Sequence, residues 1–122
     1  GLGDVYKRQR YVFSEWDAHG GEFLEKRVMK LVNLTRERNI KLVIVVFPFS
    51  NQFGEDSYTY PQQLLRNFSA EHNVTVIDML PYLKVQGAVG ELYLPGDITH
   101  FKSRGHAAVA EALAEEVLKE TR

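Results

Sequence analysis

An aspartate and a histidine stand three residues apart, as Asp97 and His100, in the stretch DITHFKSRGH. A carboxylate at this spacing can turn back and accept a hydrogen bond from the imidazole Nδ1–H, which fixes the ring tautomer and stabilises the imidazolium. The other ring nitrogen is then free to take a proton from a nucleophile. The pair is typical of an acid–base pair in which His100 is the base and Asp97 orients it.

The spacing alone is weak evidence. Five aspartates and four histidines in 122 residues give about 0.16 such pairs by chance. A structural alternative is that Asp97 accepts main-chain N–H groups near a helix start and His100 is a surface side chain. Position favours chemistry, because the pair lies in a loop between the last strand-like segment and the last helix. Open α/β sheets gather ligand chemistry in such loops.

The elements that must position this loop alternate between helices and strands. The helices are recognised by apolar residues with a helical period, and the first strand by a continuous β-branched run. Pro48 ends this strand, and Asn73 ends a helix. The alternation predicts an α/β protein with a parallel, three-layer αβα sheet of flavodoxin-like style. The predicted segments are helices over 22–38, 61–71 and 103–120, and strands over 41–47 and 74–78. The inner face predicted for the last helix is His106, Val109, Ala110, Leu113 and Val117.

Two strands make a thin sheet, since sheets commonly have about five. We therefore expect the fold to be truncated at the N-terminus. Residues 1–10 contain GLGDVYKRQ, which has no clear period and joins abruptly to the RYVFSEWDAHG stretch. They are interpreted as a non-native segment, and residues 11–122 as the C-terminal part of a single domain.

Composition narrows the classes of function. The chain is 44% hydrophobic and 25% charged, with a net charge of -1, and its isoelectric point near 6.5 gives no support for nucleic-acid binding. No apolar run is long enough to span a bilayer. The absence of cysteine excludes disulfides and thiol nucleophiles within this sequence. Composition fixes neither a compartment nor an oligomeric state.

The block LYLPGDITHFKSRGHAAVAEAL, residues 92–113, resembles the C-terminal catalytic block of the SGNH (GDSL-type) hydrolases. In that block Asp-x-x-His is followed by Gly-His and an alanine-rich helix. The preceding pattern over residues 21–91 is also similar to bacterial members. The resemblance implies that His100 is the catalytic base and Asp97 its acid, and that Gly105 allows close packing of the helix start. It implies a structural role for His106.

Departures from the family pattern concern the nucleophile. The family's serine lies in a Gly-Asp-Ser block, and this sequence contains none. Matches to the oxyanion glycine and to the Gly-x-Asn-Asp asparagine are also missing. We therefore expect the nucleophile to lie upstream of residue 1. Ser50, in FPFSNQF after the first predicted strand, is a substrate-binding candidate; the alternatives are a nucleophile or a plain loop residue.

Other polar and aromatic residues have structural interpretations. Asp78 ends a predicted strand at the edge where ligand chemistry gathers, and it is expected to cap a helix or to brace a loop. A metal site from Asp97, His100 and His106 is set aside, because no second ligand cluster accompanies it. No metal and no cofactor are predicted. The aromatic residues that could line a cleft, although packing is the alternative for each, are Trp16, Tyr58 and Tyr60.

The resemblance implies an esterase or O-acyltransferase acting on a small-molecule or carbohydrate ester. The charge and the short apolar runs predict no nucleic-acid partner and no membrane span in this chain. Residues 1–122 alone are expected to be inactive, because they lack the serine block. The resemblance favours an extracytoplasmic location. The alternative from another class is a non-catalytic α/β binding or regulatory module with a fortuitous Asp-x-x-His.

Overall fold

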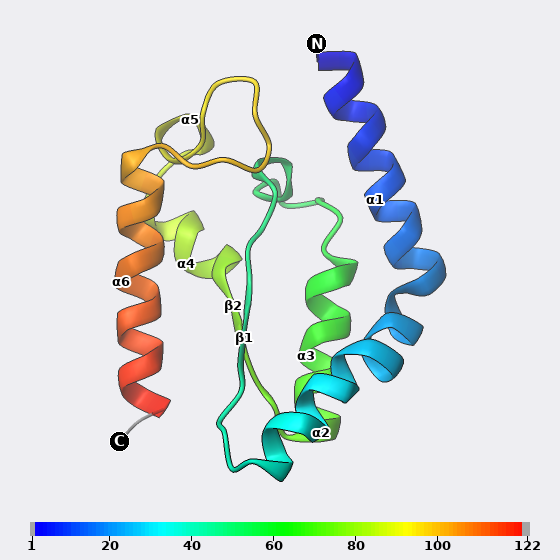
Figure 1. Ribbon diagram of the computed structural model, residues 1–122. Helices are drawn as coiled ribbons and strands as arrows, with labels where there is room; N and C mark the ends of the chain where they lie inside the picture. Colours follow the sequence, from blue (N-terminus) through cyan, green and yellow to red (C-terminus); the bar gives the residue numbers. More distant parts are fainter. Residues whose placement is uncertain (1, 121–122) are drawn as a thin grey trace. The chain divides into compact units, whose positions relative to one another are not determined.

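The computed structural model describes residues 2–120, and its first third is helical (Figure 1). Helix α1 (Leu2–Phe23) continues through a π-helical turn, η1 (Leu24–Val28), into α2 (Met29–Glu37). Asn39 follows with a φ of 53°, which is the left-handed conformation expected after a helix end. Residues 2–10 are part of α1, although their lack of periodicity predicts no element there.

The central segments have the predicted order. Strand β1 (Val43–Val46), the 3-10 turn η2 (Ser50–Gln52), helix α3 (Tyr60–His72) and strand β2 (Thr75–Asp78) succeed one another. Pro61 occupies the first turn of α3, where its missing N–H costs nothing. Asn73 ends α3 in the left-handed conformation, with a φ of 54°. The predicted helix and both strands are confirmed, with the strands shorter than expected.

The C-terminal part is helical again. Helices α4 (Met79–Gln86), α5 (Val89–Leu92) and α6 (Ser103–Glu120) come after β2. Asp78 accepts a hydrogen bond from the Leu80 N–H at 3.0 Å, which confirms its predicted role as the cap of α4. The loop between α5 and α6 carries Asp97 and His100.

The predicted three-layer, flavodoxin-like SGNH-type αβα sheet is wrong. Helices make up 67% of the chain, and the two short parallel strands form one two-stranded sheet within residues 2–120. The alternation of helix and strand holds for β1, α3 and β2. It does not extend to further strands, because α1 occupies the segment before residue 22 and helical turns fill residues 79–92.

The chain divides into two compact units, each with its own core. The first unit combines the residues up to Ile44 with Tyr58–Val76, and the second combines Val45–Ser57 with the residues from Ile77 onward. In the first unit α1 runs beside α3 (Figure 1). Its buried apolar residues are Leu24, Val32, Leu65, Phe68 and Val74. In the second unit α6 packs on α4 and α5.

The predicted inner face of α6 is only partly right. The buried residues are Gly105, Ala108, Val109 and Ala112. Val109 agrees with the prediction, but His106 and Ala110 are exposed. The helix presents small side chains inward, so it approaches its neighbours closely. The prediction selected large apolar residues and therefore missed this face.

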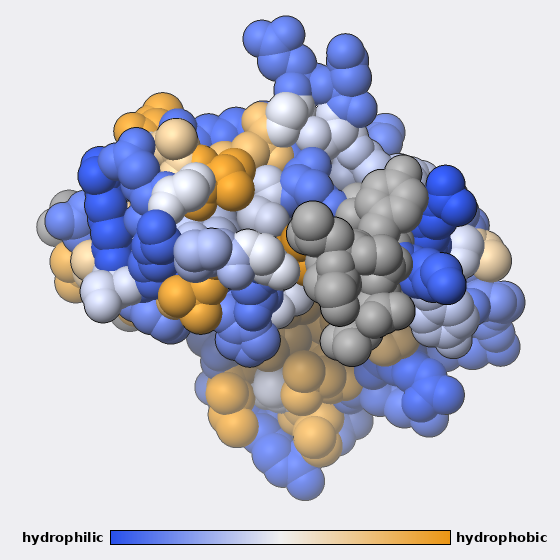
Figure 2. Space-filling view, turned by 90° about the horizontal axis from the view of Figure 1, so that it is seen from above, coloured by the Kyte–Doolittle hydropathy of each residue, from blue (hydrophilic) through white to orange (hydrophobic). Residues whose placement is uncertain are grey.

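No helix within residues 2–120 combines the length and the apolarity that a membrane crossing requires. Hydrophobic residues are nevertheless exposed at several places, and Figure 2 shows them among hydrophilic residues on the face seen from above. The most exposed of the large ones are Val85, Tyr11, Ile40, Leu118 and Phe47.

Candidate functional site

The loop that carries the acid and the base begins with a tight turn over Leu94–Asp97. Pro95 takes the second position and Gly96 the third, where its φ is +70°. A type II turn requires a positive φ at this position, which glycine adopts without strain. The Asp97 N–H donates to the Leu94 carbonyl at 3.2 Å and closes the turn. The sequence LPGD therefore fixes where Asp97 leaves the turn.

The two ends of the loop are joined by main-chain hydrogen bonds. Leu94 N–H donates to the His100 carbonyl at 3.0 Å, and Lys102 N–H donates to the Leu92 carbonyl at 2.8 Å. Between them, Tyr93 and Phe101 form an isolated antiparallel bridge. The loop is thus a short, closed hairpin-like element rather than a free connection, and His100 lies at its base.

The predicted contact between the two side chains is present. Nδ1 of His100 lies 2.7 Å from Oδ2 of Asp97. The other carboxylate oxygen, Oδ1, accepts hydrogen bonds from the Thr99 N–H at 2.8 Å and the His100 N–H at 3.1 Å. The carboxylate therefore braces its own loop with one oxygen and contacts the imidazole with the other.

The same contacts set the charge state of the acid. The hydrogen bond from the Thr99 N–H has the largest effect and lowers the pKa of Asp97, while burial opposes it. Further hydrogen bonds from the His100 ring, the His100 N–H and the Thr99 hydroxyl bring this pKa to about 2. Asp97 is consequently ionised at neutral pH. Its side chain is 34% exposed and that of His100 is 73% exposed, so the imidazole is open to solvent.

The imidazole is held through one nitrogen. Besides Asp97, the Thr99 hydroxyl oxygen lies 3.0 Å from Nδ1 of His100. Within the part of the chain that the structure describes, the polar contacts of the ring are made through Nδ1. The neutral tautomer that donates from Nδ1 to Asp97 leaves Nε2 as an acceptor, which is the state that a general base needs.

Ser50 is brought to this loop through its main chain. Its N–H donates to the carbonyl of Ile98, between Asp97 and His100, at 2.9 Å. Ser50 itself is 9% exposed. The structure thus joins the segment after β1 to the candidate loop, in keeping with the strand-end argument. The burial of Ser50 argues against an attacking role.

Gly105 allows the close approach that the sequence predicts. A Cβ atom at this position would lie 2.3 Å from the Leu92 carbonyl oxygen and 2.7 Å from Cδ1 of Phe101. The first turn of α6 therefore packs directly against the base of the loop. His106 is exposed and its ring contacts Phe101 edge to face, with centroids 5.7 Å apart. The ring contact of His106 is thus with Phe101, whose own ring lies beside Gly105.

The three aromatic residues considered for a cleft lie in the first unit. Tyr58 packs on Phe13, with ring centroids 4.2 Å apart, and its hydroxyl contacts the Phe13 carbonyl and Asp17. Tyr60 lies beside Tyr58 at 6.3 Å. For these two, packing is the observed role.

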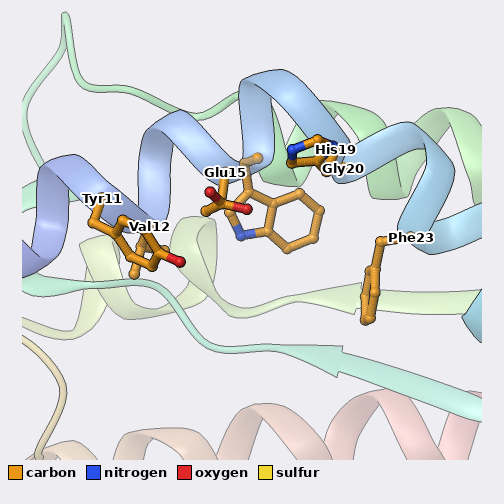
Figure 3. A pocket seen from close by; sticks show the side chains of 7 residues that line it. Tyr11, Val12, Glu15, His19, Gly20 and Phe23 are labelled. Atoms are coloured by element: carbon orange, nitrogen blue, oxygen red, sulfur yellow. The ribbon is translucent and has the colours of Figure 1, made fainter.

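Trp16 does line a pocket, which sequence reasoning did not define. The cavity has a volume of about 320 Å³. Figure 3 shows its side chains along one side of α1, with Tyr11 and Phe23 at its two ends. The pocket contains neither Asp97 nor His100, so it is separate from the candidate site. The lining residues are Tyr11, Val12, Glu15, Trp16, His19, Gly20 and Phe23.

A cluster of possible metal ligands also escaped the sequence analysis. Glu25, Glu71 and His72 bring their donor atoms within 4.8 Å of one another. Glu25 is 46 and 47 residues from its partners in the sequence, so no short motif connects them. The signal that could have located it is the Glu-His pair at the end of a predicted helix. Within residues 2–120, the group of possible ligands that the structure brings together is Glu25, Glu71 and His72 rather than Asp97, His100 and His106.

Comparisons with protein-family models, with curated proteins and with solved structures find no match to this chain.

Proposed function

We propose that Asp97 and His100 are the orienting acid and the general base of an esterase or O-acyltransferase. The observation that carries the proposal is the 2.7 Å contact between Oδ2 of Asp97 and Nδ1 of His100, with Nε2 left available. The low pKa of Asp97, about 2, supports it further, because an ionised carboxylate is what stabilises an imidazolium during proton transfer.

In this reaction a serine hydroxyl attacks the carbonyl carbon of an ester. Nε2 of His100 takes the hydroxyl proton as the new carbon–oxygen bond forms. His100 then returns that proton to the leaving alcohol as the ester bond breaks. Water or a sugar hydroxyl afterwards accepts the acyl group by the same proton transfer in reverse. Asp97 keeps the ring oriented and stays ionised throughout.

Ser50 is proposed to contact the substrate rather than to attack it. The residue is 9% exposed, which argues against attack. Its N–H donates to the Ile98 carbonyl, which brings the segment after β1 to the loop that carries Asp97 and His100. The proposed substrate is a small-molecule or carbohydrate ester, which could reach the exposed imidazole of His100. The resemblance of residues 92–113 to the SGNH hydrolases supports the same substrate class.

The test is labelling by a fluorophosphonate, which reacts with a serine activated by a histidine. The protein is the product of the complete reading frame that encodes residues 1–122. We expect labelling of the wild type, loss in His100→Gln, and a reduction of about 10⁴-fold in Asp97→Asn, as for other triads. His106→Gln is the matched control, because His106 lies in the first turn of α6 and should leave labelling at the wild-type level. Equal labelling of all variants, or none of the folded wild type, would show that Asp97 and His100 only brace the loop of a non-catalytic module.

A further inference from the structure

Three side chains of the first unit converge at one end of α3. Glu25 comes from the π-helical turn η1, while Glu71 and His72 are the last two residues of α3. Nε2 of His72 lies 3.0 Å from Oε1 of Glu25 and 3.8 Å from Oε2 of Glu71. One nitrogen and two carboxylate oxygens thus face a common point.

The separations match both ion pairs and the ligand spacing of a shared metal ion. Zinc binds nitrogen and oxygen at about 2.0–2.2 Å, so two ligands of a tetrahedral site lie about 3.4 Å apart. The two distances from His72, 3.0 and 3.8 Å, bracket that value. All three donor atoms lie within 4.8 Å of one another, and rotation of the exposed glutamate side chains would close the remaining gap.

The imidazole of His72 is held in place by other contacts. Its ring packs on Phe68 with centroids 4.6 Å apart, and its side chain is 24% exposed. Arg36 donates a hydrogen bond to the main-chain carbonyl of His72. The Phe68 contact holds the ring, whose Nε2 faces Glu25 and Glu71, and Nε2 is a common metal-binding atom of histidine.

The electrostatics favour a cation. Two carboxylates contribute a charge of about −2, against which Arg36, at the His72 carbonyl, places one positive charge. Glu25 also lies in a π-helical turn, a rare element that occurs frequently at functional sites. We propose that Glu25, Glu71 and His72 bind a divalent transition-metal ion, for which Zn²⁺ is the probe. A nitrogen ligand disfavours Ca²⁺ and Mg²⁺, which prefer oxygen. This site goes beyond the proposed function and lies in a different unit from Asp97 and His100.

The experiment is a calorimetric titration of residues 1–122 with Zn²⁺, and with Co²⁺ followed by visible absorption. We expect one saturable site, with a Co²⁺ spectrum of low coordination number. Glu25→Gln, Glu71→Gln and His72→Gln should each weaken Zn²⁺ binding by about tenfold or more, since even indirect partners of metal ligands contribute 10–100-fold. These near-isosteric changes keep the fold, which circular dichroism checks.

Two matched controls locate the binding. Glu22→Gln removes a glutamate of α1 that pairs with Lys26 instead, and His100→Gln removes the other histidine–carboxylate pair. Both should keep the wild-type affinity. Absence of saturable Zn²⁺ binding, or binding that the three cluster variants leave unchanged, would overturn the proposal and leave an ion pair between His72 and Glu25. Tighter binding of Ca²⁺ than of Zn²⁺ would overturn the assigned metal class.

Discussion

The phenol of Tyr93 donates a hydrogen bond to the main-chain carbonyl of Pro48 at 2.7 Å, joining residues 45 positions apart. Tyr93 is 2% exposed, and burial raises the pKa of its hydroxyl well above the ordinary value. Its ring also packs against Phe53 and Phe101, with centroids 5.6 and 4.7 Å away. Tyr93 therefore ties the segment after β1 to the loop that carries Asp97 and His100.

Removing the Tyr93 hydroxyl should weaken the contact between the loop and the segment after β1, without opening a cavity. In Tyr93→Phe the buried Pro48 carbonyl loses its donor, which costs about 1–3 kcal/mol of unfolding free energy. We also expect faster hydrogen exchange at the Ser50 N–H, whose acceptor is Ile98. Urea unfolding and amide exchange measure the two effects. Tyr11→Phe is the control, since Tyr11 is 66% exposed and should change stability by less than about 0.5 kcal/mol.

Gly105 should tolerate no side chain. Alanine gains about 1 kcal/mol over glycine in helix propensity, but its Cβ would lie 2.3 Å from the Leu92 carbonyl oxygen. We expect Gly105→Ala to destabilise the protein by about 1–3 kcal/mol, as overpacked cores do. Gly21→Ala meets nothing within 4 Å and should be neutral or stabilising. If both variants, or neither, have a lower urea midpoint than the wild type, steric contact with the Leu92 carbonyl does not determine the effect of Gly105→Ala on stability.

The local part of the candidate site could be predicted from the sequence. Asp97 and His100 lie three residues apart in the same loop. The positive φ of Gly96 turns the chain just before Asp97, whose side chain contacts His100. Such geometry depends on neighbours in sequence, so spacing and residue type suffice. The same is true of Asn73 and Asp78, which cap helices as expected.

The distant relationships could not be predicted in the same way. Periodicity indicates the order of β1, α3 and β2 but not how many strands the sheet contains, so it predicts a larger sheet than the two-stranded one observed. The first turns of α1 escape prediction because residues 1–10 lack an apolar stripe. The cluster of Glu25, Glu71 and His72 depends on two helices meeting, which no local pattern encodes.

Because the pKa of Asp97 is low, part of the free energy of unfolding depends on pH. Its folded pKa of about 2 is below its ordinary value of 3.8. Its ionised form therefore stabilises the fold fully above about pH 4, and this contribution is lost as pH falls through about 2. The difference in unfolding free energy between the wild type and Asp97→Asn should shrink over that range. Urea unfolding at several pH values measures it, with Asp56→Asn as an exposed control; a constant difference would contradict the shift.

Residues 1–122 alone should not turn over p-nitrophenyl acetate with saturation. The sequence has no Gly-Asp-Ser block, and Ser50 is buried. We expect a rate close to that of free imidazole, contributed by His100 and reduced in His100→Gln. Stopped-flow or plate assays at increasing ester concentration measure this. Saturable turnover that Ser50→Ala abolishes would make Ser50 the nucleophile.

The π-helical turn Leu24–Val28 has a consequence for how this chain tolerates length changes. A π turn holds one more residue than an α turn, and each residue advances a helix by about 100°. The extra residue therefore sets the angle, about the helix axis, between the side of α1 that contains Trp16 and the side of α2 that buries Val32. Deleting Lys26, which is exposed and pairs with Glu22 one turn earlier, would convert the turn to α-helix and rotate one side against the other. A single-residue deletion here would disturb the first unit more than most substitutions of surface residues.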